Sequence, residues 1–169
     1  MNDPFFSKAV VYICEHGKEG AMGIIINKPM DNKKLNNILE KTSIINTNDY
    51  KLNNKIFFGG PVLLEKGIVL HGPKFKSNKS IPISKSIFIT NEKKFLIKLK
   101  KKDTPFKLIL GHSGWSKGQL EKELENGDWL VQNATYDFIF NIPPNQMWQY
   151  ATELLGLDLL SSTGVIGKT

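Results

Sequence analysis

The stretch FKLILGHSGWSKGQLEKEL, Phe106–Leu124, carries three local structural signals in a row. Its apolar beginning, Phe106–Leu110, is typical of a buried strand. The glycine-containing residues Gly111–Trp115 predict a turn, and Lys117–Asn126 predicts a helix that Gly127 ends. A strand, a sharp turn and a helix in this order form the setting in which a hydrolase places its nucleophile.

Ser113 at the predicted turn, with His112 beside it, makes a serine hydrolase one functional hypothesis. The motif of the hydrolase elbow is G-x-S-x-G, and both glycines are needed for steric room. Gly111 supplies the first glycine, but Trp115 stands at the second position. A triad also needs a histidine and an acid from elsewhere, and the distant histidines are those at positions 16 and 71. We assign no catalytic residue and keep the Ser113 hydrolase as an alternative.

The rest of the chain mixes strand and helix signals in irregular order. The runs AVVYIC and AMGIII predict two strands joined as a hairpin, and the apolar spacing in residues 31–41 predicts a helix. This irregular order predicts an α+β fold with a largely antiparallel sheet. The further predicted strands are at residues 55–62, 67–72, 86–90 and 128–133, further helices are at 92–102 and 144–156, and residues 135–141 fit either type.

Length and composition indicate one domain, over residues 1–169, with its own core. Cys14 is the one cysteine, so an internal disulfide is excluded and a reducing, cytoplasmic setting is expected. The longest apolar runs are far too short to span a bilayer, and the N-terminal residues MNDPFF lack the features of a signal peptide. We therefore expect a cytoplasmic protein with no membrane partner.

Positive charge is concentrated in the middle of the chain. The net charge is +7 and every basic residue is a lysine, while residues 51–107 alone carry 14 lysines against three acids. Such asymmetry can mark a nucleic-acid-binding surface. The absence of arginine weakens this reading, because bidentate phosphate and base contacts favour guanidinium. The alternatives are a solvated lysine face and codon bias, since asparagine and isoleucine are also abundant.

Signals for metals and cofactors are lacking. A structural zinc site needs about four ligands at recognisable spacing, which one cysteine and three scattered histidines do not offer. The terminal residues SSTGVIGKT lack the first glycine of a phosphate-binding loop, and the sequence ends at Thr169 before the helix that would hold the phosphate. We expect neither a metal nor a cofactor, and a metal site built from histidine and carboxylate ligands is kept as the alternative.

Six segments in order resemble the AlgH/YqgE family of bacterial proteins. They are DPFFSKAVVYICEH, GAMGIIINKP, FFGGPV, GIVLH, LGHSGWSKGQLEKEL and WLV, which run from about Asp3 to Trp129 and slightly beyond. The resemblance implies one α+β domain whose bifurcated, mostly antiparallel sheet curls into a pseudo-barrel with helices packed outside. The family's biochemical function is not established. Some members carry a transcriptional-regulator label, although no recognised DNA-binding motif accompanies it.

The sequence departs from the family pattern in ways that affect the interpretation. The family usually has a further N-terminal strand before the segment that begins here at Asp3, so either the sequence starts late or that strand is missing. The family turn resembles G-Y-A-G-W, whereas this chain has His112 and Ser113 in the second and third positions. A position that accepts alanine cannot carry an obligatory nucleophile, so Ser113 is expected to be a small packing residue.

The leading hypothesis is a non-enzymatic domain that acts through a protein partner or a small ligand. The alternatives are a nucleic-acid-binding regulator using the lysine-rich segment and the serine hydrolase. Glycines in such motifs usually meet backbone demands, so their functional reading competes with a packing role. The residues predicted to form a shared family surface are His16, Asn27, Gly59, Gly60, Pro61, Gly111, Gly114, Trp115 and Gln119.

Overall fold

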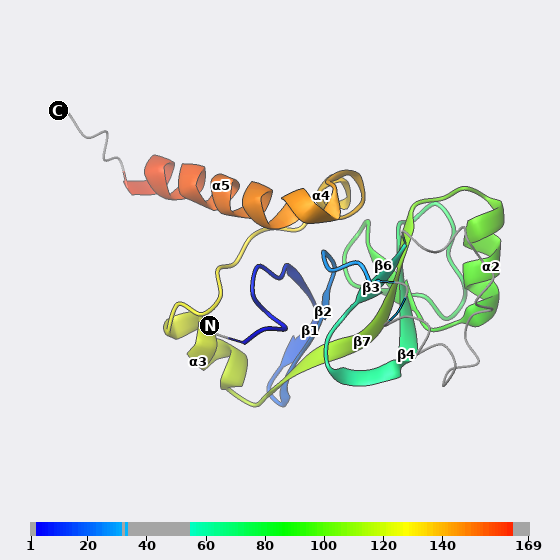
Figure 1. Ribbon diagram of the computed structural model, residues 1–169, viewed down its shortest axis with the longest axis horizontal. Coiled ribbons are helices and arrows are strands. Elements are labelled where there is room, and N and C mark those ends of the chain that lie inside the picture. The colour runs from blue at the N-terminus through cyan, green and yellow to red at the C-terminus, as the bar shows by residue number, and fades with distance from the viewer. Residues whose placement is uncertain (1–2, 32, 34–54, 164–169) are drawn as a thin grey trace.

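The computed structural model describes residues 3–31, 33 and 55–163, and its sheet begins with the predicted hairpin (Figure 1). Strand β1, Val11–Gly17, pairs antiparallel with β2, Gly20–Ile25. Both strands are rich in β-branched residues and meet at a turn whose last residue, Gly20, has a positive φ. The hairpin prediction is confirmed. The helix predicted at residues 31–41 lies almost wholly outside the described residues.

The long strand β7, Phe106–Ser116, joins two branches of the sheet. Its first half pairs antiparallel with β4, Val62–His71, and parallel with β3, Ile56–Phe58. Its second half pairs antiparallel with β2. The turn predicted at 111–115 is therefore wrong, because these residues continue the strand and are held by a neighbour.

Two short strands complete the sheet on the far side of β4. Strand β6, Phe88–Thr90, pairs with β4, and β5, Ile81–Pro82, pairs with β6. The strand order in the described residues is β1-β2-β7-β4-β6-β5, with β3 beside β7. All pairings except that of β3 with β7 are antiparallel. The predicted strands at 55–62, 67–72 and 86–90 are confirmed in place, with shifted ends.

The structure describes four helices, of which three lie where the sequence predicted a helix and one lies in the ambiguous segment. Helix α2, Lys93–Lys101, agrees closely with its prediction, as does α3, Gln119–Glu125. The ambiguous residues form helix α4, Tyr136–Asn141, capped by the Thr135 side chain. Helix α5, Pro144–Thr163, runs through the glycine at 156 that was expected to end it. The strand predicted at 128–133 is wrong, because that segment has no regular structure.

The core lies on both faces of the sheet because successive side chains of β7 point to opposite sides. Leu108 and Leu110 pack on the face that carries Phe95 and Leu99 of α2. Ile109 packs on the other face, where the core includes residues of α4 and the beginning of α5. Every one of these β7 side chains is buried. The sheet is thus covered by helices on two sides.

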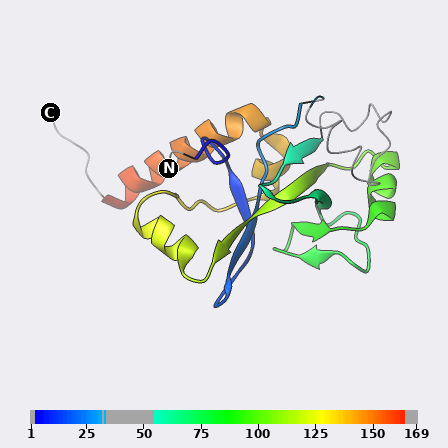
Figure 2. The same cartoon turned by 60° about the horizontal axis from the view of Figure 1, so that its bottom comes forward.

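The predicted fold class, α+β with a bifurcated, mostly antiparallel and curled sheet, is confirmed. Figure 2 shows the β1–β2 hairpin diverging from the rest of the sheet, with β7 crossing between the two branches. Helix α5 extends beyond the sheet at the end of the molecule opposite α2 (Figure 1). Within the described residues, no helix combines the length and apolarity that crossing a bilayer requires.

Candidate functional site: a glycine junction and an aromatic groove

Three of the predicted surface glycines lie where the two branches of the sheet meet. Gly59 and Gly60 follow β3 and press against Gly111 and His112 of β7, so a Cβ at Gly59, Gly60 or Gly111 would overlap backbone atoms. Gly60 and Gly111 also have positive φ angles, which L side chains rarely adopt. The Gly59 amide donates to the carbonyl of Leu110 at 2.8 Å. We call Gly59, Gly60 and Gly111 the glycine junction, and its role is close backbone packing.

Ser113 lies in this junction rather than at a reactive elbow. Its side chain is 1% exposed, and its Oγ donates a hydrogen bond to the carbonyl of Gly59 at 3.2 Å. A Cβ at Gly60 would also overlap this Oγ, so the space around Ser113 is full. Within the described chain, no histidine nitrogen forms a hydrogen bond with Ser113. A small hydroxyl fits here as a packing residue.

The remaining polar residues of the predicted surface are spread over different parts of the fold. Asn27 ties down the N-terminal segment, because its Oδ1 accepts from the Val10 amide at 2.8 Å and its Nδ2 donates to the Lys8 carbonyl at 2.9 Å. His16, on β1, contacts Glu121 of α3 through Nε2 and Oε1 at 2.5 Å. This hydrogen bond lowers the pKa of the exposed Glu121.

Pro61 and Gly114 are exposed, and neither belongs to the buried part of the junction. A Cβ at Gly114 would meet no atom within 4 Å, so this glycine is not demanded by packing. The predicted surface is therefore not one continuous patch. Its members divide into a buried junction and several separate surface positions.

Trp115 and Gln119 belong to a second cluster, which the sequence did not reveal in full. The Nε1 groups of Trp115 and Trp129 both donate to Oε2 of Glu123 at 2.8 Å, and Nε2 of Gln119 donates to Oε1 at 2.9 Å. Gln119 in turn accepts from the amide of Ser116 at 3.0 Å. We call Trp115, Gln119, Glu123 and Trp129 the indole clamp. It ties β7, α3 and the segment after α3 to one carboxylate.

The clamp carboxylate is stabilised in its charged form. Burial pushes the pKa of Glu123 upward, but the hydrogen bonds donated by Trp129, Gln119 and Trp115 outweigh it, so the pKa is lowered. Phe6 completes the packing, with its ring centroid 5.5 Å from that of Trp129 in an edge-on arrangement. Glu123 was not among the residues predicted for the family surface. Only the spacing of Glu123 four residues after Gln119 hinted at the contact.

A largely aromatic and aliphatic groove opens beside the clamp. It has a volume of about 670 Å³ and lies between residues 6–13, residues 127–134 and the exposed length of α5 that carries Trp148 and Leu155. We call it the lateral groove. At its rim Leu130 is 68% exposed and Val131 is 71% exposed. Lys8 lies over the Trp148 ring, with Nζ 5.7 Å from the centroid.

Two buried titratable groups, Lys107 and His71, are not part of the groove lining. Lys107 is 6% exposed, its Nζ donates to the Ile26 carbonyl at 3.0 Å, and burial lowers its pKa to about 8. His71 is fully buried, with Nδ1 donating to the Gly72 carbonyl and Nε2 accepting from Ser80. Burial lowers the pKa of His71, so its ring is held neutral. Both groups have partners inside the fold that explain their positions.

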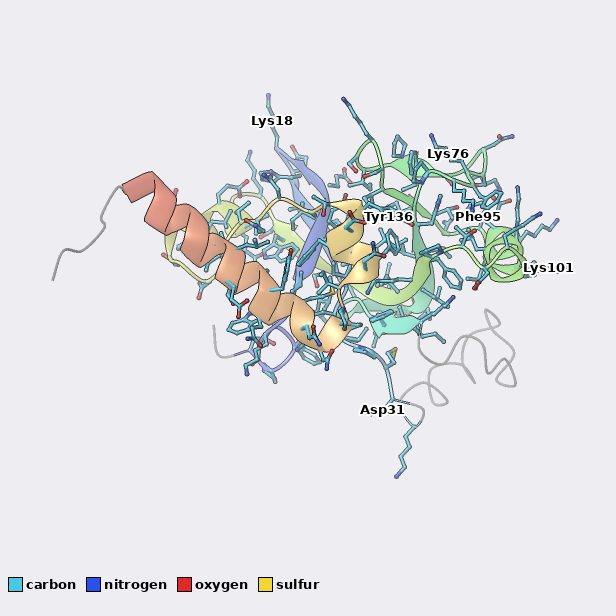
Figure 3. The ribbon with its side chains drawn as sticks, turned by 90° about the horizontal axis from the view of Figure 1, so that it is seen from above. Lys18, Asp31, Lys76, Phe95, Lys101 and Tyr136 are labelled. Atoms are coloured by element: carbon cyan, nitrogen blue, oxygen red, sulfur yellow. The ribbon has the colours of Figure 1, made fainter. Side chains whose placement is uncertain are left out.

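The part of the lysine-rich segment that the structure describes, residues 55–107, carries an exposed group of lysines. Figure 3 shows Lys76 and Lys101 on the side away from the free end of α5. Lys74 and Lys98 both lie over the Phe75 ring, with Nζ 5.8 and 5.9 Å from its centroid. Among the described residues, no group of three or more His, Cys, Asp or Glu side chains is placed to hold a metal ion.

Comparison with known proteins places these features in a family. The chain is 40% identical over 172 residues to a UPF0301 protein of Citrobacter koseri, and it is 38% identical to the UPF0301 protein YqgE of Salmonella agona; both alignments cover 99% of this chain and 92% of the relative. The solution structure of the AlgH protein from Pseudomonas aeruginosa is similar, with a TM-score of 0.73 and 28% identity, over all of this chain and 90% of that one.

A second solved structure supports the fold alone. A protein from Corynebacterium diphtheriae has a TM-score of 0.63 at 22% identity, over 88% of this chain and 78% of that one. The sequence profile of a family described as AlgH-like matches residues 1–160. Together with full-length relatives at about 40% identity, this match confirms the resemblance found in the six ordered motifs, and the chain belongs to the AlgH-like family.

Proposed function

We propose that this protein is a non-enzymatic binding domain that takes a partner segment or a small apolar ligand in the lateral groove. The observation that carries the proposal is the groove itself, whose volume of about 670 Å³ is typical of ligand sites. Apolar side chains line it, and Leu130 and Val131 remain largely exposed at its rim. Contiguous exposed apolar surface of this kind marks interaction sites in folded proteins.

The groove also has the rigid support that a binding site needs. The indole clamp fixes Trp115 and Trp129 through two hydrogen bonds to one carboxylate, and the Asn27 side chain fixes the chain at Lys8 and Val10. Side chains held in this way lose little conformational entropy when a ligand arrives. The groove is therefore largely preformed.

The experiment is a fragment screen followed through amide chemical shifts of the isotope-labelled protein. We expect small aromatic and aliphatic fragments to shift residues of the groove, and Val131→Asp to abolish these shifts. Ile97→Asp is the matched control, because Ile97 is also an exposed aliphatic side chain but lies on α2. Hits that map elsewhere, or that survive Val131→Asp, would contradict the proposal.

Nucleic-acid binding by the lysine face is a second candidate function. Its support is the convergence of Lys74 and Lys98 over Phe75, since lysines beside an aromatic ring are found in single-strand binding grooves. It requires an affinity that falls steeply with salt, because phosphate neutralisation releases counterions. A labelled single-stranded oligonucleotide titrated at low salt, with Lys74→Gln and Lys98→Gln as variants, tests it. No binding at low salt would remove this candidate.

The hydrolase alternative has its own test. Ser113 is buried and donates to the Gly59 carbonyl, so we expect no labelling of the folded protein by a fluorophosphonate probe. Labelling that Ser113→Ala removes, or turnover of any substrate that depends on Ser113 or His112, would overturn the non-enzymatic proposal.

A further inference from the structure

We propose that the lateral groove takes an extended peptide strand from a partner protein, which adds to the sheet along the free edge of β1. The inference rests on the proposed function and names the chemistry of the partner. It depends on three observations about the described residues: the backbone groups of β1, the walls of the groove and the charge around it.

The backbone of β1 has unused hydrogen-bonding groups on the groove side. The amide of Ile26 donates to the carbonyl of Val10 at 3.0 Å, which fixes the phase of the β1–β2 ladder. Residues alternate between facing toward and away from the partner strand in an antiparallel pair. The N–H and C=O groups of Val11 and Ile13 therefore point away from β2, and Ile25, opposite Val11, donates away from β1 to Gly59 in agreement.

These groups have no other backbone partner in the part of the chain that the structure describes. In the strand order of the described residues, β1 has a neighbour on the β2 side and none on the other, and Val11, Tyr12 and Ile13 line the groove. A buried or half-buried backbone group without a partner is costly. An added strand would supply donors and acceptors at the spacing that Val11 and Ile13 present, which is the recognised mode of peptide binding at an open sheet edge.

The walls of the groove favour a single extended chain over a folded edge. The segment 127–134 lies along one side and α5 along another, with Leu130 and Trp148 in the lining. One added strand needs about 4.8 Å of space beside β1. The sheet edge of a second copy would need more space, because the layers that cover that sheet lie about 10 Å from it. Alternate side chains of the added strand would contact the apolar lining, while the others face outward.

Charge near the groove orients the peptide. Helix α3, which contributes Leu120 and Leu124 to the lining, carries three glutamates and one lysine. The lining itself includes one basic side chain, Lys8, and one acidic side chain, Asp128. An apolar strand with a lysine or arginine at the end that lies beside α3 complements the net negative charge of that helix, and complementary charge speeds encounter and sets orientation. The partner is thus an extended, aliphatic segment with a basic flank.

An array of synthetic peptides tests the proposal on the full chain. Each peptide has about eight residues, the length of an ordinary strand, with valine, isoleucine, leucine or phenylalanine alternating with threonine and a lysine at either end. A second set carries N-methyl groups on alternate residues, which removes donors and blocks pairing without changing the side chains. Affinities are measured by calorimetry, and hydrogen exchange is followed at the amides of Val11 and Ile13.

We expect binding by members of the first set, slower exchange at Val11 and Ile13, and a loss of at least about tenfold in affinity on N-methylation, as removal of one or two hydrogen bonds implies. Val131→Asp should weaken binding and Ile97→Asp should not. Binding that resists N-methylation but fails with Val131→Asp would overturn strand addition and leave the groove function intact. Absence of binding by the whole array would overturn strand addition, and the fragment screen would then decide the groove function separately.

Discussion

The glycine junction and the lateral groove both include a residue of β7, Gly111 and Trp115 respectively, and they differ in how completely the chain fills them. At the junction, backbone packs on backbone so closely that no Cβ fits at Gly59, Gly60 or Gly111. At the groove, about 670 Å³ is left open beside β1, with Leu130 and Val131 exposed at its rim. The motif glycines therefore mark where the two branches join, whereas other motif segments, among them WLV, border the space that can receive a ligand.

The largest effect is expected from adding a side chain at the junction. Gly60→Ala places a Cβ against His112 and Ser113 at a positive φ, so both packing and backbone geometry resist it. We expect a loss of about 3–5 kcal/mol in the free energy of unfolding, as for overpacking combined with backbone strain. Urea denaturation measures it. Gly114→Ala is the control, because its Cβ meets no atom within 4 Å. Equal losses in the two variants would show that close backbone packing at Gly60 does not set the cost.

Lys107 is a buried lysine in the first half of β7, and the pH dependence of stability tests whether burial there disfavours its charged form. Burial lowers the pKa of Lys107 to about 8 from its usual 10.5. The unfolded chain therefore holds more protons than the folded one between these values, so the free energy of unfolding should rise with pH in this window. The rise is at most about 3 kcal/mol, from 1.36 kcal/mol per pKa unit.

Denaturation curves across this pH range provide the measurement, with Lys107→Met as the comparison. The methionine variant keeps an unbranched side chain of similar length but cannot titrate. Its stability should change less between pH 8 and 10.5. If the two proteins show the same pH dependence, Lys107 is not the group responsible.

The indole clamp should contribute an intermediate amount to stability, because hydrogen bonds to one carboxylate hold it rather than close backbone packing. Glu123→Ala leaves the two indole N–H groups of Trp115 and Trp129 without their acceptor. We expect a loss of about 2 kcal/mol, as for hydrogen bonds to a charged group, together with a change in tryptophan fluorescence. Glu125→Ala, on the exposed side of α3, should change stability by less than about 0.5 kcal/mol.

The smallest effect on folding is expected at the groove rim. Leu130→Asp changes a side chain that is already 68% exposed, so the free energy of unfolding should move by less than about 0.5 kcal/mol. Its melting temperature and its fragment binding are measured together. Intact stability with lost binding sharpens the contrast between junction and groove. A large drop in stability would show instead that the rim supports the fold.

Local patterns were sufficient to predict the elements whose residues interact with near neighbours. The β1–β2 hairpin and helix α2 follow from turn residues and apolar spacing that are close together in the sequence. The continuation of β7 through Gly111 was missed because glycine is a turn signal locally, while its strand geometry is imposed by β2 and β4, which are distant in sequence.

The candidate site was predicted less well for the same reason. Trp115 and Gln119 were among the expected residues, but their partner Glu123 was not, and Trp129 was placed in a predicted strand. The groove depends on how α5 and residues 127–134 lie beside β1. That arrangement is set by tertiary packing, for which the sequence has no short-range signal.

The sharing of β7 between two branches has a consequence for folding on the ribosome. The β1–β2 hairpin is complete at Ile25, yet its partner in the sheet begins to pair at Ser113. At about 5–20 residues per second, synthesis leaves the hairpin waiting on the order of ten seconds. Both of its edges are open during that time. Protection of the nascent hairpin, rather than the stability of the finished sheet, is then the demanding step in making this protein.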